Sequence, residues 1–568
     1  MFDVANDRLS YSELLRPDVG YTLDFAVGMT YSLDLEALLG VPVSLGLLGE
    51  ADPELMRSPL YVLEAIRNSA DRIAIFCNAG GIKLPSKIQS VYSLLEESVF
   101  EVKLTSRSNF HPKLWVLKYS GEGGDSYIKL LVLSRNLTFD SSIDLCVAMR
   151  GEIKRARRLK NKPLADMLTF VSRFAKKPKQ QKLLDLAEDI LHAAAFDVQP
   201  PFEDYTFFPM GIPEYDGAAT QLLGQKYDLF AVSPFLSDGV VREMTRCSGR
   251  RTLVTRKSSV TQTVMDAFEH VYITKDVLSD NEFGTKQDVH AKLYFTTTQE
   301  GNFLYIGSAN ASHNAFYRNV ECLLRLKYQP NHVGFKTFSQ DFIPDENCPY
   351  EELTHIPELP PADPEQKLID EALREAVYAL KRASVIPDGA RYTIQVEAKP
   401  LKTAQQVFIA PLQRPDQMCL LERQNTFSGL LLKELSEFYV LCVQDQKLVV
   451  KLETKGMPKE RDQAIYRGII DTKAKFLSYL SFVLSEDYAA ASAESDALDA
   501  LLQTQKSQET SHIPTAVVYE KMLRVFHQNP GRLKGIADMI QRLDPDVVGE
   551  EFTQMYQQFE TAARRMRK

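Results

Sequence analysis

The sequence predicts an α/β protein built from two similar lobes, followed by a C-terminal domain that is α+β but mostly helical. Three observations lead to this expectation. A strand–turn–helix opening occurs twice, each opening is followed by a β-rich segment, and the composition changes after Pro344 to a proline-rich, acidic connector. We therefore expect lobes at about residues 1–200 and 201–345, a linker at 346–364 and an accessory domain at 365–568.

The repeat begins with a shared tripeptide. Phe-Ala-Val occurs at Phe25, in YTLDFAVGMTYSLDLEALLG, and at Phe230, in KYDLFAVSPFLSDGVVREM. A serine follows seven residues later in both copies, at Ser32 and Ser237, and serine is a favoured helix N-cap. Each lobe is thus expected to open with a buried strand that leads into a helix.

A β-rich segment follows each opening. The first copy contains EVKL, HPKLWVLKY and YIKLLVLSRN, and the second contains VYITKDV, VHAKLYFTTT and NFLYIGSAN. Alternating apolar residues and β-branched content favour strands. A basic helical insertion at about residues 151–195 has no counterpart in the second copy.

The C-terminal domain opens with a predicted helix from Glu365 to Ala383. A few strands should follow (RYTIQVEA, FYVLCVQ, KLVVKLE), and then long helices such as AIYRGIIDTKAKFLSYLSFVL. We find no catalytic constellation in this part of the sequence.

Composition limits the class of protein. The formal net charge is -8, so any binding to nucleic acid must come from local basic patches. The seven cysteines are scattered without a C-x-x-C pair, which favours reduced thiols over a disulfide framework or a zinc site. The N-terminus lacks the pattern of a signal peptide. We expect a cytoplasmic protein without stable membrane association, without a metal and without a cofactor.

Two similar sets of polar residues carry the chemistry. In each lobe a His-x-Lys pair is followed by a Ser-x-Asn pair at the end of the next predicted strand. The sets are His111, Lys113, Ser134 and Asn136 in the first lobe, and His290, Lys292, Ser308 and Asn310 in the second. A spacing of two puts both members of a pair on one face of a strand. One histidine alone would more often be a packing or surface residue, whereas the duplicated set indicates shared chemistry.

These residues resemble the HKD signature of the phospholipase D superfamily, in which H-x-K is followed by G-S-x-N. The resemblance covers roughly residues 20 to 330. It implies two phospholipase D-like α/β lobes related by pseudo-twofold symmetry, with both His-x-Lys pairs facing one phosphate. The signature's aspartate is replaced by Lys118 and Thr297, and the spacing from histidine to serine is wide. The chain is therefore most similar to divergent, nuclease-like members such as tyrosyl-DNA phosphodiesterases and restriction-type nucleases.

Attack on a phosphodiester requires a nucleophile, a proton donor for the leaving oxygen, and cations or amides for the non-bridging oxygens. By resemblance, His111 would be the nucleophile and His290 the general acid, although the near symmetry leaves the order open. The lysines would neutralise the phosphate while the asparagines donate hydrogen bonds, and no divalent metal is required. Two carboxylates, Glu321 and Asp144, are expected to orient the imidazoles.

Two basic clusters are candidates for nucleic-acid binding. The first lies in the insertion, at Arg155, Arg157, Arg158 and Lys160, and can equally be a solvated helix face. The second lies upstream of the second motif, at Arg246, Arg250, Arg251, Arg256 and Lys257.

The function that fits best is a metal-independent, DNA-cleaving nuclease that acts through a phosphohistidine, with DNA favoured over RNA. Family habit suggests bacterial anti-phage defence or restriction, with a helicase or other defence-system protein bound through the C-terminal domain. Two alternatives stay open. One is a phospholipid-hydrolysing phospholipase D, and the other is a catalytically silent scaffold that binds nucleic acid.

Overall fold

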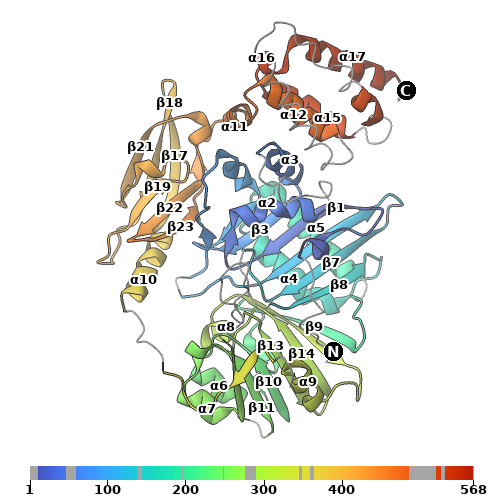
Figure 1. Cartoon of the computed structure of the whole chain (residues 1–568), viewed down its shortest axis with the longest axis vertical. Coiled ribbons are helices and arrows are strands. Elements are labelled where there is room, and N and C mark those ends of the chain that lie inside the picture. Colours follow the sequence, from blue (N-terminus) through green and yellow to red (C-terminus); the bar gives the residue numbers. More distant parts are fainter. Residues whose placement is uncertain are drawn as a thin grey trace.

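The protein has a mixed α/β fold (Figure 1). The computed structural model describes residues 11–45, 59–105, 107–138, 144–193, 196–224, 226–246, 249–275, 290–344, 348–358, 364–484, 520–525 and 531–566. Parts of the expected linker, and the N-terminal residues on which the expectation about a signal peptide rests, lie outside these ranges.

The first lobe is organised around one six-stranded sheet with the order β5-β3-β1-β6-β7-β8. β5, β3 and β1 are parallel, and the other three strands continue the sheet in antiparallel fashion. The strands are β1 (Tyr21–Met29), β3 (Ile73–Asn78), β5 (Val99–Val102), β6 (Leu114–Gly121), β7 (Ser126–Leu133) and β8 (Cys146–Glu152). All six residues of β3 are buried, as expected for a parallel strand covered on both faces.

The second lobe contains an eight-stranded sheet with the order β16-β12-β11-β10-β13-β14-β15-β9. Its inner six strands follow the same pattern as the first sheet, three parallel strands and then three antiparallel ones. The strands are β9 (Phe202–Met210), β10 (Asp228–Val232), β11 (Arg251–Thr255), β12 (His270–Thr274), β13 (Leu293–Thr298), β14 (Gly301–Gly307), β15 (Glu321–Tyr328) and β16 (Tyr350–Glu352). The short helices here are α6 (Asp238–Met244), α7 (Gln262–Ala267), α8 (His313–Tyr317) and α9 (Phe335–Phe342).

The register of the two sheets corrects the alignment of the repeat. Met29 lies opposite Leu114, three residues after the first histidine, and Val232 lies opposite Leu293, three residues after the second. Met29 therefore corresponds to Val232, and the two Phe-Ala-Val tripeptides are offset by two residues. A shift of two keeps every side chain on the same face of the strand, so similar buried residues can occur at both positions.

The two serines expected to cap helices do not do so through their hydroxyl groups. Ser32 is followed by the short strand β2 (Leu33–Asp34), and Asp34 Oδ1 accepts the hydrogen bond from Glu36 N at the start of α2 (Leu35–Ser44), at 2.9 Å. Ser237 does stand at the N-cap position of α6, but its hydroxyl accepts from His313 N at 2.8 Å.

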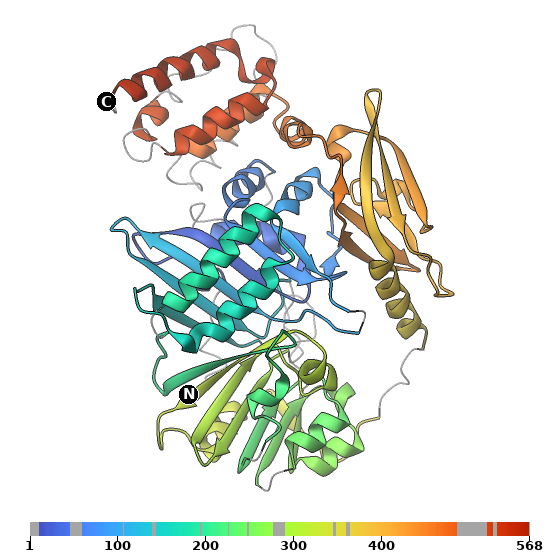
Figure 2. The ribbon, with the colours of Figure 1, turned by 180° about the vertical axis from the view of Figure 1, so that it is seen from behind.

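Helices cover the first sheet on both faces. The basic insertion forms α4 (Lys162–Ser172) and α5 (Lys177–His192), which lie over one face of the sheet in Figure 2. Their apolar residues belong to the hydrophobic cluster on that face. α2 and α3 (Pro59–Ser69) cover the other face, and α1 (Tyr11–Leu15) packs beside α2. The insertion is thus a structural layer of the first lobe; most of its charged residues are exposed, whereas Lys179 is buried and donates to Ile73 O.

The C-terminal region contains more strand than expected. α10 (Pro364–Ala379) ends where β17 begins, and residues 380–455 contain many strands, so the mainly helical character holds for the described residues after 460. The strands are β17 (Leu380–Asp388), β18 (Arg391–Ala398), β19 (Phe408–Pro411), β20 (Cys419–Leu420), β21 (Gln424–Leu430), β22 (Phe438–Val443), β23 (Gln446–Lys451) and β24 (Thr454–Lys455). The helices are α11 (Arg461–Ile469), α12 (Lys473–Leu484), α15 (Gly531–Arg542), α16 (Pro545–Val548) and α17 (Glu550–Met566).

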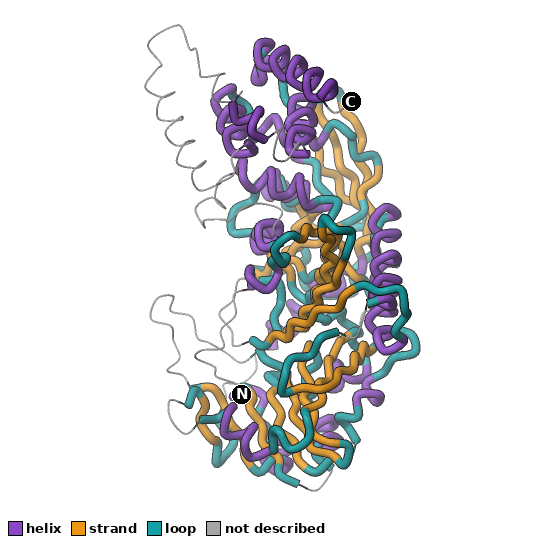
Figure 3. Tube along the Cα trace, turned by 90° about the vertical axis from the view of Figure 1, so that its right-hand side faces the viewer, coloured by secondary structure: helices purple, strands orange, loops and turns teal. Residues whose placement is uncertain are grey.

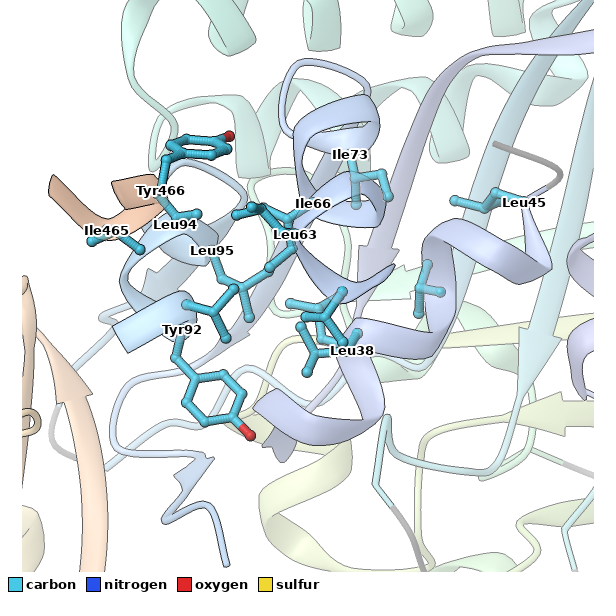
Figure 4. Packing of buried hydrophobic residues seen from close by; sticks show 14 of the residues in the cluster. Leu38, Leu45, Leu63, Ile66, Ile73, Tyr92, Leu94, Leu95, Ile465 and Tyr466 are labelled. Carbon is cyan, nitrogen blue, oxygen red and sulfur yellow. The ribbon is translucent and has the colours of Figure 1, made fainter. Parts of the chain in front are cut away.

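The C-terminal region is joined to the first lobe. One of its sheets, with the order β2-β4-β23-β22-β19-β20, takes β2 and β4 (Ile82–Lys83) from that lobe. The C-terminal helices share one hydrophobic cluster with α2 and α3, and Figure 4 shows Ile465 and Tyr466 beside Leu63, Leu94 and Leu95. In Figure 3 the second lobe, the first lobe and the C-terminal helices follow one another along the long axis.

A buried polar network also crosses this boundary. Glu96, in a 3-10 helix of the first lobe, accepts hydrogen bonds from Ser436 Oγ and Glu437 N, both at 2.7 Å. Arg461 Nη1 donates to the same carboxylate at 2.5 Å. Burial raises the pKa of Glu96 and the guanidinium of Arg461 opposes that shift. Since a buried carboxylate requires such partners, the network ties the two parts together.

Within the part of the chain that the structure describes, no helix has the length and apolar character needed to cross a membrane.

We predict that Arg461→Met lowers the stability of the first lobe. The substitution leaves Glu96 buried without its cation, which should cost about 3 kcal/mol or more in unfolding free energy. Trp115 is the one tryptophan of the chain and is 3% exposed in β6, so its fluorescence in a urea titration reports on the first lobe. The control Lys475→Ala breaks an exposed pair with Asp471 and should change stability by less than about 0.5 kcal/mol. A Trp115 transition that Arg461→Met leaves in place would show that the two parts unfold independently.

Candidate active site

The first His-x-Lys pair lies where the two lobes meet. His111 N donates to Val320 O at 2.8 Å, and Val320 N donates to Asn109 O at 2.9 Å, so Phe110 and Val320 form a parallel bridge between the lobes. His111 and Lys113 directly precede β6, and His290 and Lys292 directly precede β13, whereas the sequence placed both pairs within strands. Because His111 N bonds to the other lobe, the ladder of β6 starts only after the pair.

A carboxylate of the second lobe holds the imidazole of the first. His111 Nδ1 and Glu321 Oε2 are 2.8 Å apart, and the Glu321 side chain is fully buried. Ser308 Oγ donates to Oε2 at 2.5 Å and Asn319 Nδ2 donates to Oε1 at 3.0 Å. With its carboxylate fixed on both oxygens, Glu321 keeps the His111 proton on Nδ1 and leaves Nε2 as the nitrogen with the lone pair.

Both lysines are buried and contact their own histidines. Lys113 Nζ lies 3.1 Å from His111 Nε2 and donates to His111 O at 3.2 Å. Lys292 Nζ donates to His290 O in the same way. Two equivalent lysines therefore reach back over the histidine two residues earlier.

Electrostatic effects show that the two pairs are close to one another. Burial is the largest cause that lowers the pKa of Lys113 well below its usual range, and the charge of Lys292 is the next. Burial also lowers the pKa of His111, Lys113 and Lys292 lower it further, and Glu321 opposes these effects. Since Lys292 acts on both residues of the first pair, like charges from the two lobes converge on one place, where an anion would be favoured.

The serines and carboxylates form the same unit in both lobes. Ser308 N donates to Cys322 O, Cys322 N donates to Ser308 Oγ, both at 3.0 Å, and Ser308 Oγ donates to Glu321. In the first lobe Ser134 N donates to Leu145 O at 3.0 Å, Leu145 N donates to Ser134 Oγ at 2.9 Å, and Ser134 Oγ donates to Asp144 Oδ1 at 2.8 Å. Asp144 thus corresponds to Glu321 although the sequence spacing differs, and its charge acts on Lys113.

The two asparagines also occupy corresponding places. The residue after each one donates its backbone N–H to a hydroxyl at the end of the lobe's first strand. Leu137 N donates to Thr30 Oγ1 at 3.0 Å and Ala311 N donates to Ser233 Oγ at 2.9 Å. Among the described side chains, Asn136 Oδ1 and Asn310 Oδ1 are buried and have no hydrogen-bond partner. The unused atom of each amide is an acceptor, so a hydrogen bond to a phosphate oxygen would have to come from Nδ2.

The first basic cluster lies away from this place. Arg155, Arg157, Arg158 and Lys160 are exposed and follow the far end of β8, which starts two residues after Asp144. Seven strand residues put the cluster roughly 20 Å from Asp144. Acidic neighbours also neutralise part of the positive charge of this cluster, since Arg157 pairs with Glu188 at 3.0 Å and Lys160 pairs with Asp204.

The second basic cluster is divided between two edges of the second sheet. Arg246, Arg250 and Arg251 lie near the start of β11, where Arg250 pairs with Asp228 at 2.9 Å and Arg251 with Glu269 at 3.8 Å. Arg256 and Lys257 follow the end of β11. At this end of the strand Thr255 Oγ1 donates to Ser233 O at 2.7 Å. Ser233 Oγ in turn accepts from Ala311 N, so this edge lies beside Asn310. The guanidinium of Arg256 lies 4.7 Å from the ring centroid of Phe235, which is 50% exposed.

Several residues of the site were not recognised from the sequence. One is Tyr31, whose ring centroid lies 5.1 Å from that of His111. Asn78 Oδ1 accepts a hydrogen bond from Phe110 N. Asn319 accepts from Asn109 N and donates to Glu321. Asn319 lies two residues before Glu321, and a spacing of two in an extended segment was an available signal. The other residues are brought in from elements distant in sequence. Among the described residues, no group of three or more His, Cys, Asp or Glu side chains is arranged to hold a metal ion.

Comparisons with known proteins give distant structural neighbours. No protein-family model and no curated protein sequence matches the chain. A variant of yeast tyrosyl-DNA phosphodiesterase matches with a TM-score of 0.36 and 12% identity over 54% of this chain and 82% of that one. The yeast enzyme itself matches with a TM-score of 0.34 and 13% identity over 55% and 84%. A polyphosphate kinase from Porphyromonas gingivalis matches with a TM-score of 0.28 and 10% identity over 54% of this chain and 40% of that one.

All three TM-scores lie below 0.5, so no activity or substrate is transferred from these proteins to the chain.

We predict that Glu321→Gln lowers the pKa of His111 further. The carboxylate stabilises the imidazolium, so removing its charge favours the neutral ring. The measurement is a histidine titration by NMR with ring-labelled protein, assigned with His111→Ala. Glu352→Gln is the matched control, because Glu352 Oε1 lies 2.6 Å from Nδ1 of the exposed His270 and the substitution should leave His111 unchanged. An unchanged pKa of His111 in Glu321→Gln would contradict the electrostatic link.

Proposed function

We propose that the chain is a phosphodiesterase of the phospholipase D type, with one active site formed by the His-x-Lys pairs of two lobes related by pseudo-twofold symmetry. The observation that carries the proposal is the convergence across the lobe junction. Glu321 of the second lobe holds His111 of the first, and Lys292 acts electrostatically on both His111 and Lys113. A histidine held by a buried carboxylate and two neighbouring lysines, with His290 proposed as the second histidine, match the needs of phosphoryl transfer.

In the proposed mechanism His111 Nε2 attacks phosphorus and forms a phosphorus–nitrogen bond. The bond from phosphorus to the leaving oxygen breaks, and His290 protonates that oxygen. His290 then takes a proton from water, whose oxygen attacks phosphorus and displaces His111 Nε2. A neutral His111 is required at the start, and its lowered pKa supplies that form near neutral pH.

The other residues of the site stabilise charge. Lys113 and Lys292 neutralise the non-bridging oxygens, and the Asn136 and Asn310 amides hydrogen-bond to them. No divalent metal takes part in this scheme. In this scheme the role of Glu321 toward His111 is assigned to Asp144 toward His290, because the two carboxylates occupy corresponding places beside Ser134 and Ser308.

The substrate we propose is nucleic acid, with DNA favoured over RNA. Support comes from Arg256 and Lys257 at the edge of the second sheet nearest to Asn310, where Arg256 stacks on the exposed ring of Phe235. A cation beside an exposed ring can bind the backbone and stack on a base. A role in defence or restriction, with a helicase bound to the C-terminal region, stays a prediction from the motif resemblance.

We predict that the protein cleaves labelled DNA in excess EDTA and that His111→Ala and His290→Ala each lower the rate by about a hundredfold or more. The rates are measured on single- and double-stranded DNA and RNA. His270→Ala is the control, because His270 is an exposed histidine of the second sheet paired with Glu352. Cleavage that EDTA abolishes, or that neither substitution affects, would contradict the two-histidine mechanism. Binding without cleavage would favour the scaffold, and headgroup release from liposomes would favour a phospholipase.

We further predict that a covalent phosphohistidine accumulates on His111 in His290→Asn. This variant lacks the base that activates water, so the second step slows more than the first when the leaving group is good. The adduct is located by denaturing quench at alkaline pH and peptide mass mapping, with His111→Ala as the blank. An adduct on His290 in the reciprocal variant, and none on His111, would reverse the assignment of nucleophile and acid.

A further inference from the structure

The helix that opens the C-terminal region contacts the segment that carries His111. Arg374 of α10 donates from Nη2 to Ser108 O at 3.3 Å and to Asn109 Oδ1 at 3.2 Å. In Figure 1, α10 lies at the end of the C-terminal strands that points toward the second lobe. A charged side chain from outside both lobes therefore reaches the residues just before the histidine.

Two further side chains fix α10 on the same segment. Tyr378 Oη donates to Thr105 O at 3.1 Å. In the opposite direction, Lys103 Nζ donates to Val377 O at 2.9 Å and to Leu380 O at 3.1 Å. The contact thus involves donors from both partners and extends over residues 103–105 and 107–109.

From Asn109 the hydrogen bonds continue to the carboxylate that holds the imidazole. Asn109 N donates to Asn319 Oδ1 at 3.0 Å, and Asn319 Nδ2 donates to Glu321 Oε1 at 3.0 Å. Asn109 O accepts from Val320 N in the bridge between the lobes. Arg374, Asn109, Asn319 and Glu321 are therefore consecutive members of one hydrogen-bonded chain that ends at His111.

The charge of Arg374 also acts on Tyr31, a neighbour of His111. Burial raises the pKa of Tyr31, the charge of Arg374 opposes that shift, and the Tyr31 ring packs on His111. The positive charge of α10 thus acts on the ring beside the imidazole, and its guanidinium bonds to the segment that carries His111.

We propose that Arg374 is a positioning residue for His111. It holds Asn109 so that the bridge between Phe110 and Val320 stays in register and His111 Nδ1 stays on Glu321. The docking of the C-terminal region on the first lobe thereby controls whether the site between the two lobes is competent. Only the activity measurement below rests on the proposed function.

The test compares Arg374→Ala with Lys367→Ala in the full chain. Lys367 is the matched control, because it lies on the same helix with a 79% exposed side chain and its ion-pair partner Glu371 belongs to that helix. The first readout is the His111 titration by NMR. The groups around this imidazole are Glu321, Lys113, Lys292 and the Tyr31 ring, and both variants retain them. We expect Arg374→Ala to lower the pKa of His111, because Glu321 is no longer held beside it, and Lys367→Ala to leave it unchanged.

The second readout is kinetic. Arg374→Ala should lower kcat by about tenfold or more with little change in KM, because misplacement of a reacting group affects the chemical step. Arg374→Lys should restore part of the rate, since lysine keeps a cationic donor but lacks the planar fork. A purely structural role would lower the unfolding midpoint and leave both the pKa of His111 and kcat per folded molecule unchanged, and that result would overturn the proposal.

A double-mutant cycle tests the same link from its other end. Asn109→Ala should shift the His111 titration in the same direction, and adding Arg374→Ala should cause little further change. Fully additive shifts would show that the two residues act separately and would refute the proposed chain. If the wild-type protein cleaves no phosphodiester, the proposed function fails, while the titrations still decide whether Arg374 positions His111.

Discussion

The contact between His111 and Glu321 is the interaction on which the site depends. A carboxylate without solvent exposure must be satisfied by the protein, and Ser308, Asn319 and His111 satisfy it from both lobes. Any change in the relative placement of the lobes would leave that charge without part of its hydrogen bonding. The same contact therefore fixes the tautomer of the histidine and the geometry of the lobe junction.

The C-terminal region has a comparable constraint. Its strands complete a sheet with β2 and β4 of the first lobe, its helices share a hydrophobic cluster with that lobe, and Arg461 pairs with Glu96 across the boundary. These strand, apolar and ionic contacts join the described C-terminal residues to the first lobe. A domain boundary drawn from a change in composition identifies where the chain changes character and does not show which surfaces stay separate.

Local periodicity made part of this structure predictable. The Ser-x-Asn pairs directly follow β7 and β14, and the His-x-Lys pairs directly precede β6 and β13. A spacing of two puts both members of a pair on one side of an extended chain, so this grouping could be predicted even though the pairs lie just outside the strands. Long-range contacts were beyond such reasoning. Asn109 and Asn319 are 210 residues apart and Arg374 is 265 residues from Asn109, so nothing in the local sequence indicates that they meet. The split of the second basic cluster across β11 and the offset of the Phe-Ala-Val repeats likewise depend on strand length and register.

The burial of Lys113 beside Lys292 has a further consequence. Burying these two lysines beside one another lowers the free energy of unfolding, and apolar side chains of similar volume at these positions would relieve that cost. Sequences selected for stability alone would therefore be expected to lose these lysines. Their presence in both lobes indicates that the fold gives up some stability to keep a positive electrostatic potential where an anion can bind.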